Sequence, residues 1–204
     1  MRTKTLIASA IFCILFAAIS LAVERVSEAS RQSKQPWKFE DTQSKVHNPF
    51  DDEKTKAVVL VFVTTDCPIA NYYQPTLTTL TKQFAKKGIP FFQLHADPEA
   101  KVDVLRKHAD EYKIAAPVIH DRDQVFAKRV GARVTPEAFL ISRKGEIVYR
   151  GRIDDLYADF GKRRRVPRNH DLRDAIEHFV DGKDIKKSKT RAVGCYIPYR
   201  TRKN

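Results

Sequence analysis

Residues 56–73 read KAVVLVFVTTDCPIANYY, and this stretch decides the fold. Apolar and mostly β-branched residues run from Ala57 to Val63 without alternation, which is typical of a strand buried on both faces of a sheet. A short polar turn follows, and apolar residues then recur at helical spacing, which predicts a helix over residues 69–87. Cys67 therefore lies between a buried strand and the start of a helix.

Strand and helix patterns alternate after this stretch. Strands are predicted at residues 89–95 and 116–120, helices at 97–112, 124–130 and 169–180, and a β-hairpin at 138–149. Strands that alternate with helices form a parallel unit, and the hairpin adds antiparallel strands to it. The predicted fold class is therefore α/β, with a central mixed β-sheet flanked by helices.

The two ends of the chain differ from this central region. Arg2 and Lys4 precede an apolar run over residues 6–23, which is typical of a signal peptide with a small-x-small cleavage site at residues 20–22, or of an uncleaved membrane anchor. We expect cleavage and export to the periplasm or the extracellular space, and an anchor would instead give membrane association. The predicted organisation is a signal peptide or anchor at 1–23, a polar linker at 24–45, one domain at 46–182 and a basic tail at 183–204.

Composition favours one folded domain with extensions. The 204 residues are 42% hydrophobic and 31% charged, which excludes a fully disordered chain. The formal net charge is +13, but Lys and Arg are scattered along the whole sequence, so we expect a solvated basic surface and no nucleic-acid partner. One local cluster, residues 162–165 with Arg168, is predicted to be an exposed loop. An acidic partner or an anionic lipid surface is the alternative reading of that cluster.

The cysteines carry the chemistry. Cys13 lies inside the apolar N-terminal run, so Cys67 and Cys195 are the cysteines of the exported part. A helix N-terminus stabilises a thiolate, and a thiolate is a nucleophile toward disulfides and peroxides and a ligand for soft metals. The alternative is a buried Cys67 that packs as a small apolar side chain.

The sequence gives no spaced set of metal ligands. Histidines such as His95, His120 and His170 could join the two cysteines, but no Cys-x-x-Cys or His-x-x-x-His spacing occurs. We therefore expect no bound metal and no cofactor. Copper delivery stays open as part of a non-enzymatic alternative.

Two segments resemble a known family. VVLVFVTTDCPIANYY at residues 58–73 and GARVTPEAFL at 131–140 are similar to the redoxin branch of the thioredoxin superfamily, which includes the alkyl hydroperoxide reductase/thiol-specific antioxidant family and the TlpA-like proteins. The likeness spans about residues 39–180. It implies a thioredoxin-like fold, and a cis Pro136 after Thr135 that lies beside the reactive cysteine, helps to hold extended substrates and keeps metal from the sulfur.

Two departures limit what the resemblance implies. A thioredoxin-like site has Cys-x-x-Cys, and here Ala70 stands in the second cysteine's place. A peroxiredoxin has Pro-x-x-x-Thr-x-x-Cys, and here Thr64 matches but Leu60 replaces the proline. Thr64 could bind the thiolate or a peroxide oxygen, and Arg133 could supply a cation, but a turn hydroxyl and a surface charge are the favoured readings.

Cys195 is the candidate that completes the chemistry of Cys67. A sulfenic acid or mixed disulfide at Cys67 needs a second thiol, so Cys195 is predicted to resolve it, with a static disulfide or an intermolecular link as alternatives. The predicted function is an exported thiol-based oxidoreductase that acts on protein thiols and disulfides or on a peroxide, with an external thiol reductant. A binding or copper-delivery module is the non-enzymatic alternative.

Overall fold

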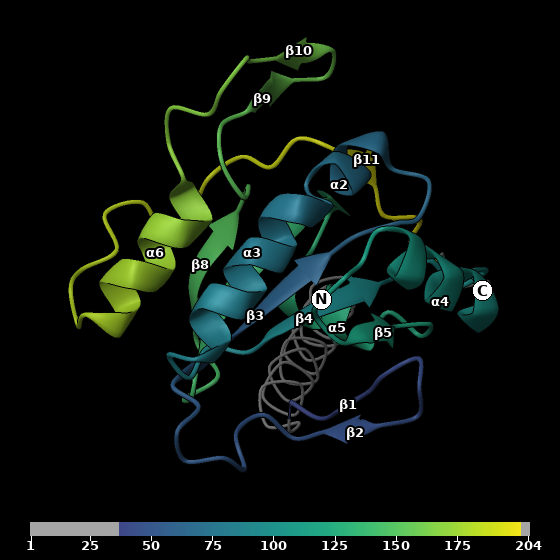
Figure 1. Cartoon of the computed structure of the whole chain (residues 1–204), viewed down its shortest axis with the longest axis horizontal. Helices are drawn as coiled ribbons and strands as arrows, with labels where there is room; N and C mark the ends of the chain where they lie inside the picture. The colour runs from purple at the N-terminus through teal and green to yellow at the C-terminus, as the bar shows by residue number, and fades with distance from the viewer. Residues whose placement is uncertain (1–36, 201–204) are drawn as a thin grey trace, which may run out of the picture. The chain divides into compact units, whose positions relative to one another are not determined.

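A five-stranded mixed sheet forms the centre of the computed structural model, which describes residues 37–200 (Figure 1). Its order is β5-β4-β3-β7-β8, with β3 (Ala57–Phe62), β4 (Phe91–His95), β5 (Val118–His120), β7 (Glu137–Ser142) and β8 (Ile147–Gly151). β3 runs parallel to β4 and β4 to β5, whereas β7 is antiparallel to both β3 and β8. The prediction of an α/β fold with a mixed sheet is confirmed.

Helices cover both faces of this sheet. They are α2 (Pro68–Tyr72), α3 (Gln74–Ala85), α4 (Val102–Glu111), α5 (Val125–Val130) and α6 (Asp171–Val180). Side chains of β3 point alternately to two apolar clusters, as the two-residue period of a strand requires. Val59 and Val61 pack in the cluster that includes Leu77 of α3 and Ile176 of α6. Leu60 and the β3 residues two positions before and after it pack in the other cluster, which includes residues of α5.

The helix predicted over residues 69–87 is two helices in the structure. α2 ends at Tyr72 and α3 begins at Gln74, with Pro75 in its first turn. Proline has no N–H to donate to the preceding turn, so the chain starts a new helix there. Figure 1 draws the short α2 as a helix separate from α3, and Cys67 is the N-cap of α2.

Residues 37–45 differ from the predicted linker. β1 (Phe39–Glu40) pairs with β2 (Val46–His47), and the side chains of Trp37 and Phe39 are buried in the core. The Phe39 ring lies 4.7 Å from the Phe92 ring and 4.8 Å from the Phe126 ring, so its apolar area is removed from water and holds this segment on the domain. The predicted signal segment and the rest of the predicted linker lie outside the described residues. Within residues 37–200, no helix is long and apolar enough to cross a bilayer.

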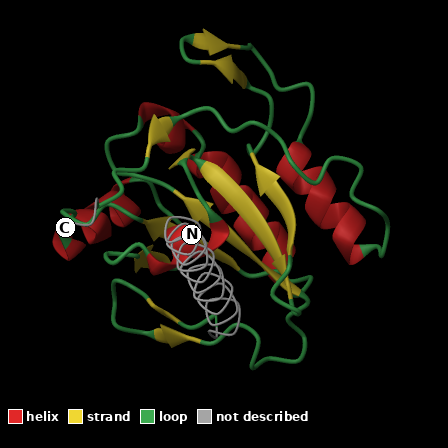
Figure 2. Cartoon of the chain, turned by 180° about the vertical axis from the view of Figure 1, so that it is seen from behind, coloured by secondary structure: helices red, strands yellow, loops and turns green. Residues whose placement is uncertain are grey.

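The C-terminal tail returns to the domain. After α6 it passes β8 and reaches the vicinity of α2 (Figure 1, yellow). There β11 (Cys195–Tyr196) pairs antiparallel with β6 (Val134–Thr135). A separate hairpin, β9 (Tyr157–Asp159) and β10 (Lys162–Arg163), projects from the domain at the same end (Figures 1 and 2). The predicted tail is thus a docked strand that belongs to the folded unit.

Candidate functional site

Cys67 lies at the carboxyl end of β3, where the chain turns into α2. Its side chain is 0% exposed, and it is the N-cap of α2. The sulfur accepts the backbone N–H of Ala70 at 3.5 Å and donates to the carbonyl of Thr135 at 3.0 Å. The strand-turn-helix placement predicted for Cys67 is therefore present, and two backbone groups fix the direction of its thiol.

The loop that faces Cys67 contains the predicted proline. The peptide bond between Thr135 and Pro136 is cis. The Thr135 hydroxyl lies 3.2 Å from the Thr64 hydroxyl. Thr64 is therefore beside the site, but its hydroxyl bonds to this distant loop and not to its own turn.

Cys195 enters the site from β11. Its backbone pairs with Thr135, and its side chain lies next to the Cys67 side chain. Both cysteines are free thiols. Burial, the neighbouring Cys67 thiol and the negative charge of Asp66 together raise the pKa of Cys195 to about 11. The structure thus brings together two sulfurs that are far apart in the sequence.

Gly194 allows this approach. A Cβ atom on Gly194 would lie 1.9 Å from the carbonyl oxygen of Thr135 and 2.5 Å from its carbonyl carbon. These are backbone atoms that cannot swing aside, so a side chain at this position would force β11 away from β6. Further along the tail, Ile197 is buried, its N–H donates to Arg133, and the Tyr199 hydroxyl donates to Ala132.

Asn71 and His108 hold the turn that precedes Cys67, and the sequence did not predict these hydrogen bonds. The Asn71 amide donates to the carbonyl of Thr65 at 2.8 Å, and its oxygen lies 2.8 Å from Nε2 of His108. Burial lowers the pKa of His108, and burial together with neighbouring histidines lowers the pKa of the adjacent His95 to about 3. Both histidines are therefore neutral at pH 7. The available signal was the placement of Asn71 four residues after Cys67, on the same face of α2.

Asp154 and Asp155 are buried structural carboxylates. Asp154 accepts the Tyr73 hydroxyl and the N–H of Leu156. Burial opposes the ionisation of Asp155, but hydrogen bonds from Asn169 and the Arg168 N–H lower its pKa to about 2. Asp155 thereby ties the loop between β8 and β9 to the segment that leads into α6.

Comparison with known proteins agrees with this arrangement. Residues 33–150 match the AhpC/TSA family. The chain belongs to that family. No curated protein matches the sequence significantly.

Solved structures show the same fold for this AhpC/TSA protein. A hypothetical protein from Sinorhizobium meliloti has a TM-score of 0.71 at 23% identity and covers 82% of this chain and 92% of its own. An uncharacterized conserved protein from Geobacillus kaustophilus has a TM-score of 0.70 at 24% identity, with 81% and 89% covered. A putative thioredoxin from Neisseria meningitidis has a TM-score of 0.50 at 19% identity, with 58% and 77% covered. The redoxin resemblance and the thioredoxin-like fold are confirmed.

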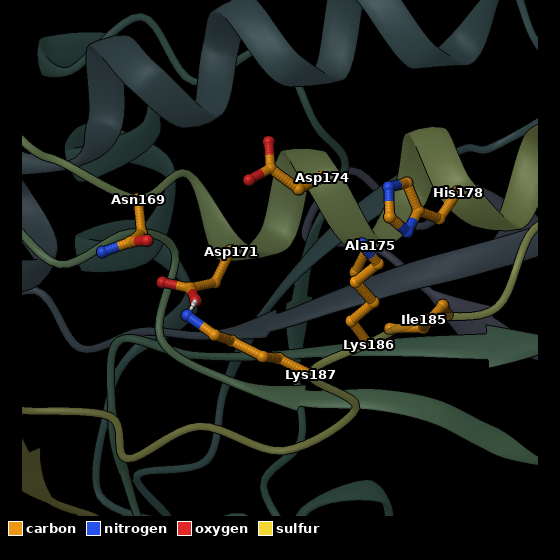
Figure 3. Close-up of a pocket in the computed structure, with 8 residues that line it drawn as sticks. All are labelled: Asn169, Asp171, Asp174, Ala175, His178, Ile185, Lys186 and Lys187. Atoms are coloured by element: carbon orange, nitrogen blue, oxygen red, sulfur yellow. Dashed lines mark ion pairs between the residues drawn. The ribbon is translucent and has the colours of Figure 1, made fainter.

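Two of the hollows formed by residues 37–200 adjoin the C-terminal tail of this AhpC/TSA protein. One, of about 500 Å³, borders the β6–β11 ladder and includes Arg133, Arg150, Lys189, Arg191 and Tyr196. Arg133 is exposed there, which agrees with the favoured reading of a surface charge. The other hollow, of about 200 Å³, lies between α6 and the tail and contains no cysteine (Figure 3). Its lining residues are Asn169, Asp171, Asp174, Ala175, His178, Ile185, Lys186 and Lys187. Among residues 37–200, no group of three His, Cys, Asp or Glu side chains is arranged to hold a metal ion.

Proposed function

We propose that this protein is an exported thiol-disulfide oxidoreductase in which Cys67 is the nucleophile and Cys195 the resolving thiol. The observation that carries the proposal is that a tail strand paired with the cis-proline loop brings the Cys195 thiol next to the Cys67 thiol. Export rests on the apolar run of residues 6–23. Membership of the AhpC/TSA family supports thiol chemistry in general.

The raised pKa of Cys195 supports the division of roles. With its pKa near 11, Cys195 stays protonated at neutral pH, so the proposal gives the resolving role to Cys195 and the attack to Cys67, which lies at the helix start. The Cys67 thiolate attacks one sulfur of a substrate disulfide, a mixed disulfide forms, and one substrate thiolate leaves. The Cys67 sulfur then carries no negative charge, which removes one of the effects that keep Cys195 protonated.

Resolution follows from the same geometry. Cys195 loses its proton to water and attacks the Cys67 sulfur, so the Cys67–Cys195 disulfide forms and the second substrate thiolate leaves. The substrate gains two electrons and the protein loses two. An external thiol then reduces the protein disulfide. Because Cys67 is 0% exposed, a protein substrate reaches it only when the tail moves aside.

The environment of Cys67 favours disulfide exchange over peroxide reduction. The Thr64 hydroxyl bonds to Thr135, and Arg133 lies at the exposed hollow, so neither is free at the sulfur to bind a peroxide. Replacement of either cysteine tests the proposal in a chain that carries Cys13→Ser throughout. Cys195→Ser is expected to accumulate a mixed disulfide at Cys67 when it is mixed with a disulfide-bonded protein, and Cys67→Ser is expected to form none.

Peptide mass mapping after acid quenching and alkylation reads out both variants. The unsubstituted pair is expected to give the Cys67–Cys195 disulfide and reduced substrate. An unmodified Cys67 in Cys195→Ser, with an adduct at Cys195 in Cys67→Ser, would reverse the roles and refute the proposal. Rapid oxidation by hydrogen peroxide, with no reaction toward disulfides, would assign the protein to peroxide reduction instead.

A further inference from the structure

We infer that the surface around Cys195 docks an acidic segment of the protein that exchanges disulfides with this site. The inference rests on the proposed function and adds the chemistry of the partner. The surface, here called the basic rim, consists of exposed cations on the tail, on the cis-proline loop and on the β9–β10 hairpin: Arg133, Lys162, Arg163, Lys189 and Arg191.

The basic rim is continuous around the end of β11. Arg133, Lys189 and Arg191 line the hollow of about 500 Å³ together with Tyr196, which directly follows Cys195. Arg191 reaches the hairpin through an ion pair of 3.5 Å with Asp159, the residue opposite Lys162 in the β9–β10 ladder. The hairpin, α2 and β11 lie at one end of the sheet (Figure 1).

Most of the charge of the basic rim is not neutralised within the domain, because Arg191 is, among the described residues, its one member with an ion pair. Glu137 is the carboxylate of the hollow, and it is buried and already bound to Arg150 at 3.0 Å and to the N–H of Arg133 at 2.8 Å. Among the ion pairs of residues 37–200, none includes Arg133 or Lys189. Asp66, which directly precedes Cys67 and is exposed, adds one negative charge close to Cys195. The rim therefore presents a net positive field to a partner.

Exposed aromatic side chains occur on the same elements as these cations or next to them. Tyr196 is 82% exposed, Phe160 at the tip of the hairpin is 58% exposed, and Tyr72 of α2 is 48% exposed. The Arg163 guanidinium lies 4.8 Å from the centre of the Tyr72 ring. Arginine with tyrosine and phenylalanine is the composition of protein–protein contact surfaces, and a hollow suits a side chain or a short acidic segment better than a flat lipid surface. These features favour a polypeptide as the occupant.

The test separates docking from chemistry with two sets of synthetic peptides of equal length. In one set a single cysteine is flanked by Glu, Gln or Lys residues, and in the other serine replaces that cysteine. Two cysteine peptides reduce the Cys67–Cys195 disulfide to two thiols and become a peptide disulfide, and the second-order rate of this reaction is measured. Fluorescence anisotropy of the serine peptides measures binding without any thiol chemistry.

At low salt we expect the Glu serine peptides to bind at least about tenfold tighter, and the Glu cysteine peptides to react at least about tenfold faster, than the matching Gln peptides. Both differences are expected to disappear at about 0.5 M salt. Lys189→Gln/Arg191→Gln is expected to reduce that advantage several-fold. The matched control Lys82→Gln/Lys107→Gln removes the same charge from α3 and α4, away from the basic rim, and is expected to keep it.

Each outcome decides between the two proposals. Equal binding of the Glu, Gln and Lys serine peptides would overturn the acidic partner, even if all the cysteine peptides open the disulfide. Discrimination by the serine peptides with no opening of the disulfide would support the docking surface and reject the oxidoreductase. Loss of binding to phosphatidylglycerol vesicles in Lys189→Gln/Arg191→Gln, with no peptide discrimination in either protein, would assign the basic rim to lipid.

Discussion

Gly194→Ala is expected to detach the tail from the cis-proline loop without unfolding the domain. The new methyl would lie 1.9 Å from the Thr135 oxygen, about 1.5 Å short of ordinary contact, so β11 must leave its register on β6. Two lost backbone hydrogen bonds at about 1 kcal/mol each shift the docking equilibrium by about 2 kcal/mol, or about 30-fold. We expect the Cys67–Cys195 disulfide to form about 30-fold more slowly and Cys67 to be alkylated faster.

Quenched-flow alkylation after the addition of a small disulfide, followed by mass mapping, measures both rates for Gly194→Ala. Gly182→Ala is the matched control, because its methyl meets nothing within 4 Å at the end of α6. Its φ of +68° costs about 1–2 kcal/mol in global stability but leaves the tail in place. Equal rates of internal disulfide formation in the two variants would refute the argument that backbone contact at Gly194 sets the position of Cys195.

Three further predictions concern pH and the core. Because the pKa of Cys195 is raised to about 11, its alkylation in the reduced protein is expected to be slow near pH 8 and to rise toward pH 11. Cys67→Ser removes part of the cause and is expected to shift the alkylation profile to lower pH. An unshifted profile would contradict an interaction between the two cysteine side chains. The pKa of Asp155 is lowered to about 2, so its ionisation contributes stability that is present above the ordinary pKa of 3.8 and is lost as the pH falls toward 2. Urea unfolding of Asp155→Asn is expected to show a smaller loss of the free energy of unfolding over that pH range. The buried side-chain amides of Gln74 and Gln93 donate hydrogen bonds of 3.0 and 2.8 Å to each other. Replacement of either residue by Leu is expected to lower the free energy of unfolding by about 1–3 kcal/mol, and the double replacement by less than the sum of the two. Additive losses in urea unfolding would show that the pair does not act as a unit.

The fold was predictable where the signal is local. β3 and the β7–β8 hairpin follow from continuous apolar runs and a turn, because their patterning is complete within a few residues. The break between α2 and α3 was missed, although Pro75 was visible, because the apolar spacing continues across it. Burial of Trp37 and Phe39 was missed because two aromatics in a polar segment show no periodicity.

The candidate site was predictable only in part, because its contacts join distant segments. Cys67 was singled out from its neighbours in the chain, whereas its contact with Cys195 depends on a strand that pairs with β6 some 60 residues earlier. The position of Gly194 against Thr135 leaves no local pattern. The Asn71–His108 hydrogen bond likewise joins α2 to α4, which the sequence could not align.

Because the second thiol is tethered to the same chain, its effective concentration at Cys67 is set by the tail and not by the surroundings. Short tethers give values in the millimolar range, well above the amount of any one partner protein. Internal resolution would then be first order, independent of protein dilution, and would release the partner before a second molecule could capture it. A lone cysteine that lacks a second cysteine three residues on can thus behave kinetically as one member of a dithiol.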